Sequence, residues 1–205
     1  MQFVCLDLEG VLVPEIWIEV ARRTGIGQLT RTTRDEPDYD KLMRYRLDIL
    51  ARERIKLADL QGVIAGMAPL DGAREFLDRL RERYQVLILS DTFYEFAQPL
   101  MRQLGRPTLL CHRLEIDANG FVSNYLLRMP EHKRAAVLAV RALNFRVVAA
   151  GDSYNDTAML AAADAGILFH PPQEIAALFP QFGVTRTYAG LAAAIDEAAS
   201  SGRLR

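Results

Sequence analysis

An apolar run at the start of the chain leads directly into two acidic residues. Residues 3–6 read Phe-Val-Cys-Leu, and Asp7, Leu8, Glu9 and Gly10 follow. A short, continuous apolar run is typical of a strand that is buried on both faces of a sheet. Burying carboxylates at its end is costly unless a cation or a proton neutralises them. The stretch therefore indicates a site at Asp7 and Glu9, although a strand followed by an ordinary polar loop fits it equally well.

From residue 71 onward, strand and helix patterns alternate. Apolar runs predict strands at 86–89, 147–150, 165–169 and 184–188, and helical periodicity predicts helices at 73–80, 93–104, 133–143, 155–163 and 191–199. Short strands are expected at 108–111 and 113–116, and a turn at 117–120 with an apolar return makes a β-hairpin near 111–128. This alternation predicts an α/β fold, a Rossmann-like doubly wound parallel sheet.

Residues 13–70 differ, because they contain helical patterns and no strand pattern. Helices are expected over 14–25, 38–50 and 57–67. In the second of these, Arg46 lies on the same face as Leu42, Met43 and Leu50. An arginine in an apolar stripe either binds an anion or extends its charged end along the surface into water. The periodicity leaves both alternatives open.

Polar residues follow three of the predicted strands, at Asp7, Ser90 and Asp152. Because ligands of open parallel sheets bind at the carboxyl ends of the strands, we expect these residues to lie close together. The carboxylates of Asp7, Glu9, Asp152 and Asp156 would then repel one another unless a divalent cation were bound among them. All the donors are hard oxygens, so Mg²⁺ is the expected metal.

A carboxylate, a hydroxyl and Mg²⁺ in one crevice suit phosphoryl transfer. Lys133, at the start of a predicted helix, is a candidate cation for the phosphoryl oxygens, although a solvated surface lysine fits the local pattern as well. His112, His132 and His170 lack the spacing of metal ligands, and we expect structural roles for them.

The composition narrows the classes of partner. A net charge of −1 provides no electrostatic basis for binding nucleic acid or an anionic membrane. The chain shows neither a signal-peptide pattern nor an apolar segment of about 20 residues. Cys5 and Cys111 are far apart and are expected to be buried thiols, as in proteins of a reducing cytoplasm. We therefore expect a cytoplasmic protein that acts on small molecules, with a homodimer as one open alternative for its assembly.

These motifs together resemble the four motifs of the haloacid dehalogenase superfamily. They are residues 7–11 (DLEGV), Ser90, Lys133 and residues 151–156 (GDSYND), in the right order and each after the expected element. Within the superfamily the chain is similar to the phosphoserine phosphatase group. This resemblance implies that residues 13–70 form a helical cap, inserted after the first strand into a core of residues 1–12 and 71–205.

The resemblance also implies roles for individual residues. Asp7 would be the nucleophile that becomes an aspartyl phosphate, and Glu9 the general acid and base. Mg²⁺ would be held by Asp7, Asp152 and the backbone carbonyl of Glu9, with Asp156 ordering its waters. The implied substrate-binding residues are Glu15 and Arg46 for the ammonium and carboxylate, and Ser90, the Asp91 backbone and Lys133 for the phosphoryl group. Asn155 would contact either the substrate or its phosphate.

Residues 89–96 and 151–156 look like the ThrH type of this group, which implies transfer of phosphate to homoserine and a role in serine and threonine biosynthesis. The chain departs from the wider family at Glu9, where Asp is usual, and at Val11, where Thr is usual. Two other functions stay open. One is a phosphatase of another small phosphorylated metabolite, and the other is a phosphorylated signalling receiver, which also uses an aspartate, Mg²⁺, a hydroxyl and a lysine.

Overall fold

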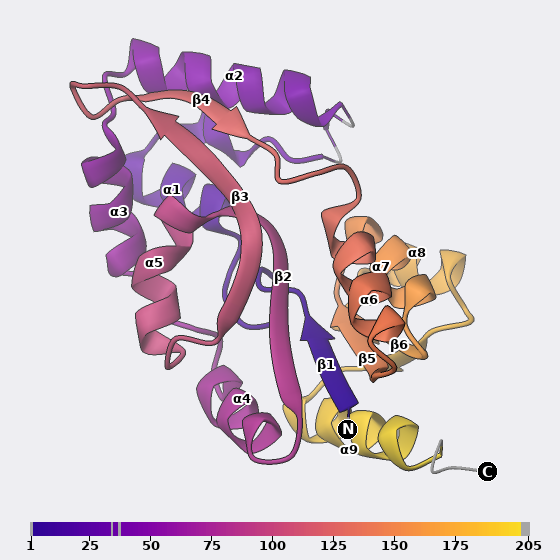
Figure 1. The fold of residues 1–205 in the computed structure, drawn as a ribbon. Helices are drawn as coiled ribbons and strands as arrows, with labels where there is room; N and C mark the ends of the chain where they lie inside the picture. Colours follow the sequence, from indigo (N-terminus) through magenta and orange to yellow (C-terminus); the bar gives the residue numbers. More distant parts are fainter. Residues whose placement is uncertain (1, 34, 37, 202–205) are drawn as a thin grey trace.

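The computed structural model describes residues 2–33, 35–36 and 38–201. These residues form one seven-stranded sheet in the order β4-β3-β2-β1-β5-β6-β7 (Figure 1). Every neighbouring pair is parallel except β3 and β4. The strands are β1 (Gln2–Leu6), β2 (Gln85–Phe93), β3 (Thr108–Ile116), β4 (Val122–Leu126), β5 (Arg146–Gly151), β6 (Ala165–Phe169) and β7 (Gly183–Thr185).

The order of the strands reverses between β1 and β5. From β1 the chain adds β2, β3 and β4 on one side, and β5, β6 and β7 lie on the other. Leu6 pairs with Ile88 of β2 and with Ala150 of β5, so these three strands approach the same edge of the sheet. In doubly wound sheets the ligand crevice opens at this reversal, beyond the carboxyl ends of the strands. The predicted fold class is confirmed.

Helices cover both faces of the sheet (Figure 1). They are α4 (Ala73–Arg81), α5 (Tyr94–Gln103), α6 (His132–Ala142), α7 (Thr157–Ala162), α8 (Gln173–Leu178) and α9 (Tyr188–Ser200). Along β1, Val4 and Leu6 belong to the hydrophobic cluster that contains residues of α4, α5 and α9, whereas Cys5 belongs to the cluster with residues of α6 and α7. This alternation with a period of two residues is expected of a strand that is buried on both faces.

The stretch from residue 13 to residue 70 is helical, as the sequence predicts. It contains α1 (Ile16–Thr24), a 3₁₀ helix (Gly27–Thr30), α2 (Tyr39–Arg52) and α3 (Leu57–Ala65). The β3–β4 hairpin reaches α2 (Figure 1), where Tyr125 donates a hydrogen bond to Asp40 and Arg44 donates one to Asn124 at 3.0 Å. Apolar residues of these helices share one hydrophobic cluster with α4 and α5. The division into a core and a cap therefore stays a prediction.

Two strands differ from the sequence-based expectation. β2 does not end before Ser90 but continues to Phe93, with a break in its pairing register after Leu89. β3 is one strand rather than two, because His112 is buried beside Phe93 and Tyr39 and does not interrupt the strand. A polar residue within an apolar run thus marks a buried contact here and not a loop.

The C-terminal third also differs in detail. A 3₁₀ turn (Tyr154–Asp156) precedes α7, which is shorter than predicted, and both β7 and α9 begin earlier than predicted. α8 was not expected, because none of its residues is buried and it therefore has no apolar stripe to detect.

The two cysteines are free and buried, as predicted. Burial raises the pKa of Cys5 to about 12, and burial also raises the pKa of Cys111 above its ordinary value. Among the described helices, none combines the length and the apolar character that crossing a bilayer requires.

Candidate active site

Strand ends and one helix bring the predicted site residues together. Asp7 follows β1, Asp152 follows β5, Ser90 lies in β2, and Lys133 stands in the first turn of α6. The backbone N–H of Asp7 donates to the carbonyl oxygen of Ala150 at 2.9 Å, which extends the pairing of β1 with β5. Asp7, Ser90 and Lys133 are buried. The crevice predicted from the strand order therefore contains these side chains.

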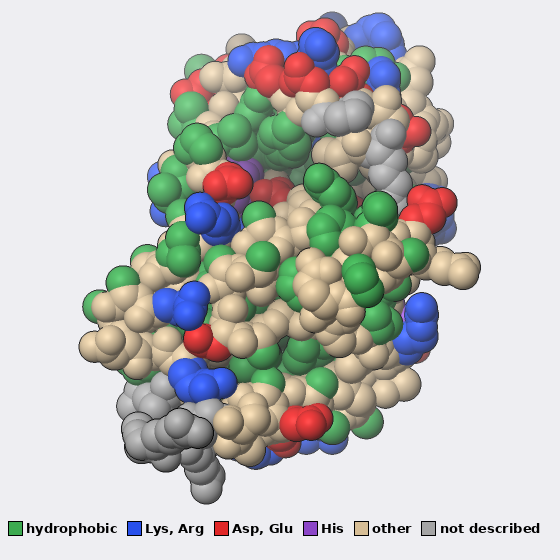
Figure 2. All heavy atoms as spheres, turned by 90° about the vertical axis from the view of Figure 1, so that its right-hand side faces the viewer, with side chains coloured by type: hydrophobic (Ala, Val, Ile, Leu, Met, Phe, Trp, Pro, Cys, Tyr) green, Lys and Arg blue, Asp and Glu red, His purple; other side chains and the backbone are tan. Residues whose placement is uncertain are grey.

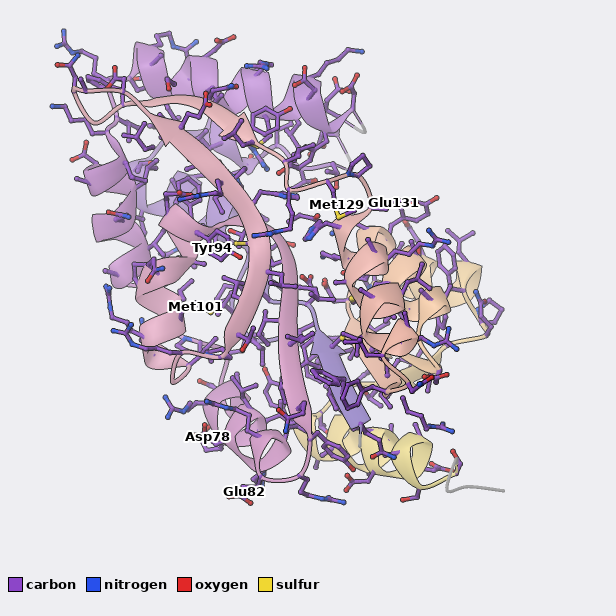
Figure 3. All side chains as sticks on the ribbon, in the orientation of Figure 1. Asp78, Glu82, Tyr94, Met101, Met129 and Glu131 are labelled. Atoms are coloured by element: carbon purple, nitrogen blue, oxygen red, sulfur yellow. The ribbon has the colours of Figure 1, made fainter. Side chains whose placement is uncertain are left out.

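Lys133 lies among three carboxylates. Its Nζ is 2.8 Å from Oδ1 of Asp156, 2.9 Å from Oδ1 of Asp7 and 3.2 Å from Oδ2 of Asp91. Figure 3 shows Glu131, two residues earlier, where the chain enters α6. Burial alone would lower the pKa of Lys133, but the charges of Asp156, Asp7 and Asp91 outweigh it and raise that pKa well above its ordinary value. Lys133 is thus a permanent buried cation, and the surface-lysine alternative is wrong.

The acids around Lys133 outnumber it. Oxygens of Asp7, Asp152 and Asp156 lie within 4.8 Å of one another. Burial, followed by the charge of Asp156, raises the pKa of Asp7 well above its ordinary value and that of Asp152 to about 7. Carboxylates this close must bind either protons or a cation.

The backbone beside these acids leaves room for their carboxyl groups. Gly10 has a φ of 76°, and a Cβ there would lie 2.4 Å from Cγ of Asp152, while a Cβ on Gly151 would lie 2.4 Å from Cβ of Asp156. Oδ2 of Asp156 accepts hydrogen bonds from the backbone N–H groups of Asp152 and Ser153 at 3.0 and 3.2 Å. Hard carboxylate oxygens held at these separations fit a divalent cation such as Mg²⁺.

A second group of charges lies at the start of α1. Oε2 of Glu9 accepts a hydrogen bond from the backbone N–H of Ile16 at 2.9 Å, and the exposed Glu15 directly precedes that helix. Burial, followed by the charge of Glu15, raises the pKa of Glu9 to about 8. A raised pKa favours the protonated form of Glu9, and this is the state that a general acid needs.

Arg46 is only 6 % exposed, so the alternative of a charged end in water is wrong. Its Cζ lies 4.6 Å from the centre of the Trp17 ring, and its Nη2 donates to the carbonyl oxygen of Arg31 at 2.8 Å. Its Nε is buried and has no hydrogen-bond partner among the residues that the structure describes. Burial lowers the pKa of Arg46 to about 10 against the opposing charges of Glu9 and Glu15, so the group stays charged at neutral pH. A buried cation with an unused N–H fits an anionic ligand.

Asp91 connects the site with two histidines that were not expected there. Its Oδ2 accepts a hydrogen bond from Nδ2 of Asn155 at 2.7 Å. Nε2 of His132 lies 3.0 Å from its Oδ1, and Nε2 of His112 lies 3.6 Å from the same oxygen. The two histidines are far apart in the chain, so spacing could not reveal the cluster. The available signal was that His132 directly precedes Lys133.

The site extends from the surface into the interior. Figure 2 shows a hollow between the upper part of the molecule, which contains α2, and the lower part, with acidic side chains and a histidine visible inside it. Glu15 and Asn155 are exposed, whereas Asp7 and Lys133 are buried. A ligand would therefore reach the buried Asp7 and Lys133 from the surface near Glu15 and Asn155.

A doubly wound sheet with an aspartate after β1 and a buried lysine opposite it defines the class of protein. A family model described as haloacid dehalogenase-like hydrolase matches residues 1–164, and the chain belongs to this family. The resemblance inferred from the four motifs is confirmed, and membership of a hydrolase family disfavours the signalling receiver.

Individual relatives are closely similar. The chain is 62 % identical over 191 residues to phosphoserine phosphatase ThrH of Pseudomonas aeruginosa, covering 93 % of each chain. It is 61 % identical over 188 residues to a phosphoserine phosphatase of Pseudomonas syringae pv. tomato, covering 92 % of this chain and 79 % of that relative.

Solved structures share the fold at low sequence identity. A substrate-bound phosphoserine phosphatase complex superimposes with a TM-score of 0.76 at 18 % identity, covering 95 % of this chain and 97 % of the other. Phosphoserine phosphatase from T. onnurineus gives a TM-score of 0.71 at 22 % identity, covering 97 % and 94 %.

Proposed function

We propose that the protein is a Mg²⁺-dependent phosphoserine phosphatase that works through an aspartyl phosphate on Asp7 and also transfers the phosphoryl group to homoserine. The observation that carries this proposal is the buried contact between Asp7 and Lys133, two residues from Glu9, whose pKa is raised. The names of the two Pseudomonas relatives support phosphoserine as the substrate.

The chemistry needs two displacements at phosphorus. In the first, a carboxylate oxygen of Asp7 attacks, the bond between phosphorus and the serine oxygen breaks, and Glu9 gives its proton to that oxygen. In the second, Glu9 takes a proton from the acceptor hydroxyl, whose oxygen attacks phosphorus and releases the carboxylate of Asp7. Lys133, Ser90 and the backbone of Asp91 hold the phosphoryl oxygens during both steps.

The acidic cluster supplies the metal ligands. Asp7, Asp152 and the backbone carbonyl of Glu9 would hold Mg²⁺, which when bound neutralises charge on the phosphoryl oxygens. Asp156 has both carboxylate oxygens occupied, by Lys133 and by two backbone N–H groups. Its proposed part is therefore to order waters on the metal and to hold Lys133.

The charges beside α1 would recognise the amino-acid part of the substrate. Arg46 offers a buried guanidinium with an unused N–H to the carboxylate, and Glu15 offers a carboxylate to the ammonium. Homoserine carries the same two groups, with one more methylene before its hydroxyl. Binding in the position that serine leaves would make its attack on the aspartyl phosphate effectively intramolecular, which can offset the higher concentration of water.

The proposal places the enzyme in the cytoplasm, in serine and threonine biosynthesis. A homodimer is the alternative to a monomer, and light scattering of the purified protein distinguishes them.

The test is to incubate the enzyme with phosphoserine, Mg²⁺ and homoserine and to follow products by ³¹P NMR. We expect inorganic phosphate without homoserine, and phosphohomoserine in addition when homoserine is saturating. Inorganic phosphate alone under both conditions would reduce the proposal to a phosphatase. If a parallel screen showed faster hydrolysis of another phosphorylated metabolite, that metabolite would replace phosphoserine as the proposed substrate.

A further inference from the structure

The two carboxylate oxygens of Asp91 face different partners. Oδ1 meets Nε2 of His132 at 3.0 Å and Nε2 of His112 at 3.6 Å. Oδ2 meets Nδ2 of Asn155 at 2.7 Å and Nζ of Lys133 at 3.2 Å. One oxygen thus contacts two imidazoles, and the other contacts two donors of the proposed phosphoryl site.

The imidazoles of His112 and His132, which face Oδ1 of Asp91, are buried and in contact with each other. The side chains of both histidines are about 4 % exposed, and their ring centres lie 4.4 Å apart. The backbone N–H of Arg128 donates to Nδ1 of His112 at 3.1 Å, and the guanidinium of Arg128 donates to the hydroxyl of Tyr94 at 2.9 Å. Figure 3 shows Tyr94 where α5 begins and Met129, the next residue after Arg128, before α6. His112 is therefore held by β3 and by the segment before α6, whereas Nδ1 of His132 is buried and has no hydrogen-bond partner among the described residues.

The contacts of both histidines indicate that they donate to Asp91. Nε2 of His132 faces a carboxylate oxygen, which can only accept when Asp91 is ionised. Because Nδ1 of His112 accepts a hydrogen bond from the backbone N–H of Arg128, the ring proton of a neutral His112 is on Nε2, which lies 3.6 Å from Oδ1 of Asp91. A metal-bound imidazole normally donates from its other nitrogen, which is the opposite arrangement. The ammonium of Lys133, 3.2 Å from Asp91, would also repel a second cation.

Asp91 itself is ionised. Burial raises its pKa, but the charge of Lys133 and the hydrogen bonds from His112, His132 and Asn155 outweigh burial and hold that pKa well below its ordinary range. Its backbone carbonyl accepts a further hydrogen bond from the hydroxyl of Tyr39 at 3.2 Å. The residue is thus a fixed negative charge.

We infer that Asp91 is a positioning residue: His112 and His132 hold one of its oxygens, so that the other oxygen aims Lys133 and Asn155 at the phosphoryl group. The inference rests on the proposed function, because it gives Lys133 and Asn155 a phosphoryl group to bind. It concerns the side chain of Asp91, whereas the proposed phosphate contact uses its backbone.

The first test is Asp91→Asn, which keeps the size of the side chain and removes its charge. We expect kcat for phosphoserine to fall about ten- to a hundredfold, the range for losing a charge-assisted hydrogen bond. KM should stay within twofold or so of wild type, because Glu15 and Arg46 are untouched. The matched control is Asp196→Asn, which removes a carboxylate that accepts hydrogen bonds from Arg83 and Tyr84 far from the site, and should leave kcat unchanged.

The second test asks whether His132 acts through Asp91. His132→Leu should lower kcat in the same way, and His132→Gln, which retains an N–H donor, should recover most of the loss. The double variant Asp91→Asn/His132→Leu should be no slower than Asp91→Asn alone, because the two side chains work as one unit. Losses that multiply, or an Asp91→Asn enzyme with wild-type kcat, would overturn the inference.

A third measurement does not depend on turnover. ¹⁵N NMR of histidine-labelled, metal-free protein should show the Nε2–H tautomer for His112 and His132, and Asp91→Asn should shift both Nε2 signals. An Nδ1–H tautomer at His112, or stoichiometric zinc in the purified protein that His112→Asn removes, would establish a metal site instead. Failure of the wild type to hydrolyse phosphoserine would contradict the proposed function, and the tautomers would still report on the positioning of Asp91.

Discussion

Nζ of Lys133 lies 2.9 Å from Oδ1 of Asp7, and each side chain is 5 % exposed. The proposed nucleophile is therefore paired with the proposed phosphate-binding cation before substrate arrives. Breaking a buried pair of this kind leaves an uncompensated charge. The pair links the stability of the fold directly to the chemistry of the site.

Replacing Lys133 by Met should lower the free energy of unfolding by about 3–5 kcal/mol in metal-free buffer at pH 8. The pKa of Asp7 is already raised in the folded protein, so stability is lost as pH rises and the acid ionises. We therefore expect a smaller loss at pH 5 than at pH 8, measured by urea unfolding. The control is Lys41→Met on α2, whose exposed side chain should matter little. A loss that is equal at both pH values would contradict this account.

Asp7→Asn should abolish turnover of every phosphomonoester and leave the fold intact. Removing a covalent nucleophile costs several orders of magnitude in rate. Phosphate release is the measurement, with circular dichroism to check folding and mass spectrometry to check that the new amide has not deamidated. Activity close to wild type in intact Asp7→Asn protein would eliminate the aspartyl phosphate.

Arg46→Ala should lower kcat/KM for phosphoserine far more than for p-nitrophenyl phosphate, which has no carboxylate. A lost charge-assisted hydrogen bond corresponds to about ten- to a hundredfold in kcat/KM. Arg44→Ala is the matched control, because Arg44 lies on the same helix but is exposed and binds Asn124. Equal losses on both substrates would show that Arg46 is structural.

Removal of metal should stop phosphate release, and Mg²⁺ should restore it. Because Mg²⁺ should bind the folded and not the unfolded state, it should also stabilise the protein by about 2.7 kcal/mol at a concentration of 100 times its Kd. Thermal unfolding with and without Mg²⁺ measures this, and Asp152→Asn should abolish the stabilisation. Full activity after exhaustive chelation would exclude a metal from the mechanism.

Neither cysteine should react with a thiol reagent in the native protein at pH 8. Because burial raises the pKa of Cys5 to about 12, only about one Cys5 in ten thousand is a thiolate at that pH. Titration with a disulfide dye should count no fast thiols in buffer and two in denaturant. Rapid labelling of Cys5 in buffer would show that β1 opens more easily than its burial indicates.

Much of the architecture could be predicted because the signals are local. β1, β5 and β6 are buried on both faces and appear in the sequence as apolar runs. α2 and α4 are buried on one face and appear as apolar stripes with helical spacing. α8 is six residues long and its residues are at most partly buried, with Ile175 packed against the core, so the sequence shows no clear apolar stripe there.

Some residues of the candidate site could likewise be predicted from the sequence, and others could not. Asp7, Ser90 and Asp152 could be brought together from sequence because each follows or continues a strand and the strands are parallel. His112 and His132 could not, because their contact depends on how β3 and α6 pack across the sheet. Packing of this kind leaves no periodic pattern in the chain.

The reach of the β3–β4 hairpin onto α2 has a consequence for engineering. This contact joins two stretches of chain that lie far apart in the sequence, since Asp40 and Arg44 of α2 meet Tyr125 and Asn124 of β4. A graft that moved only residues 13–70 into a relative would separate α2 from its partner strand. A transplant of these helices would therefore have to carry residues 111–128 as well, so that α2 keeps its contact with β4.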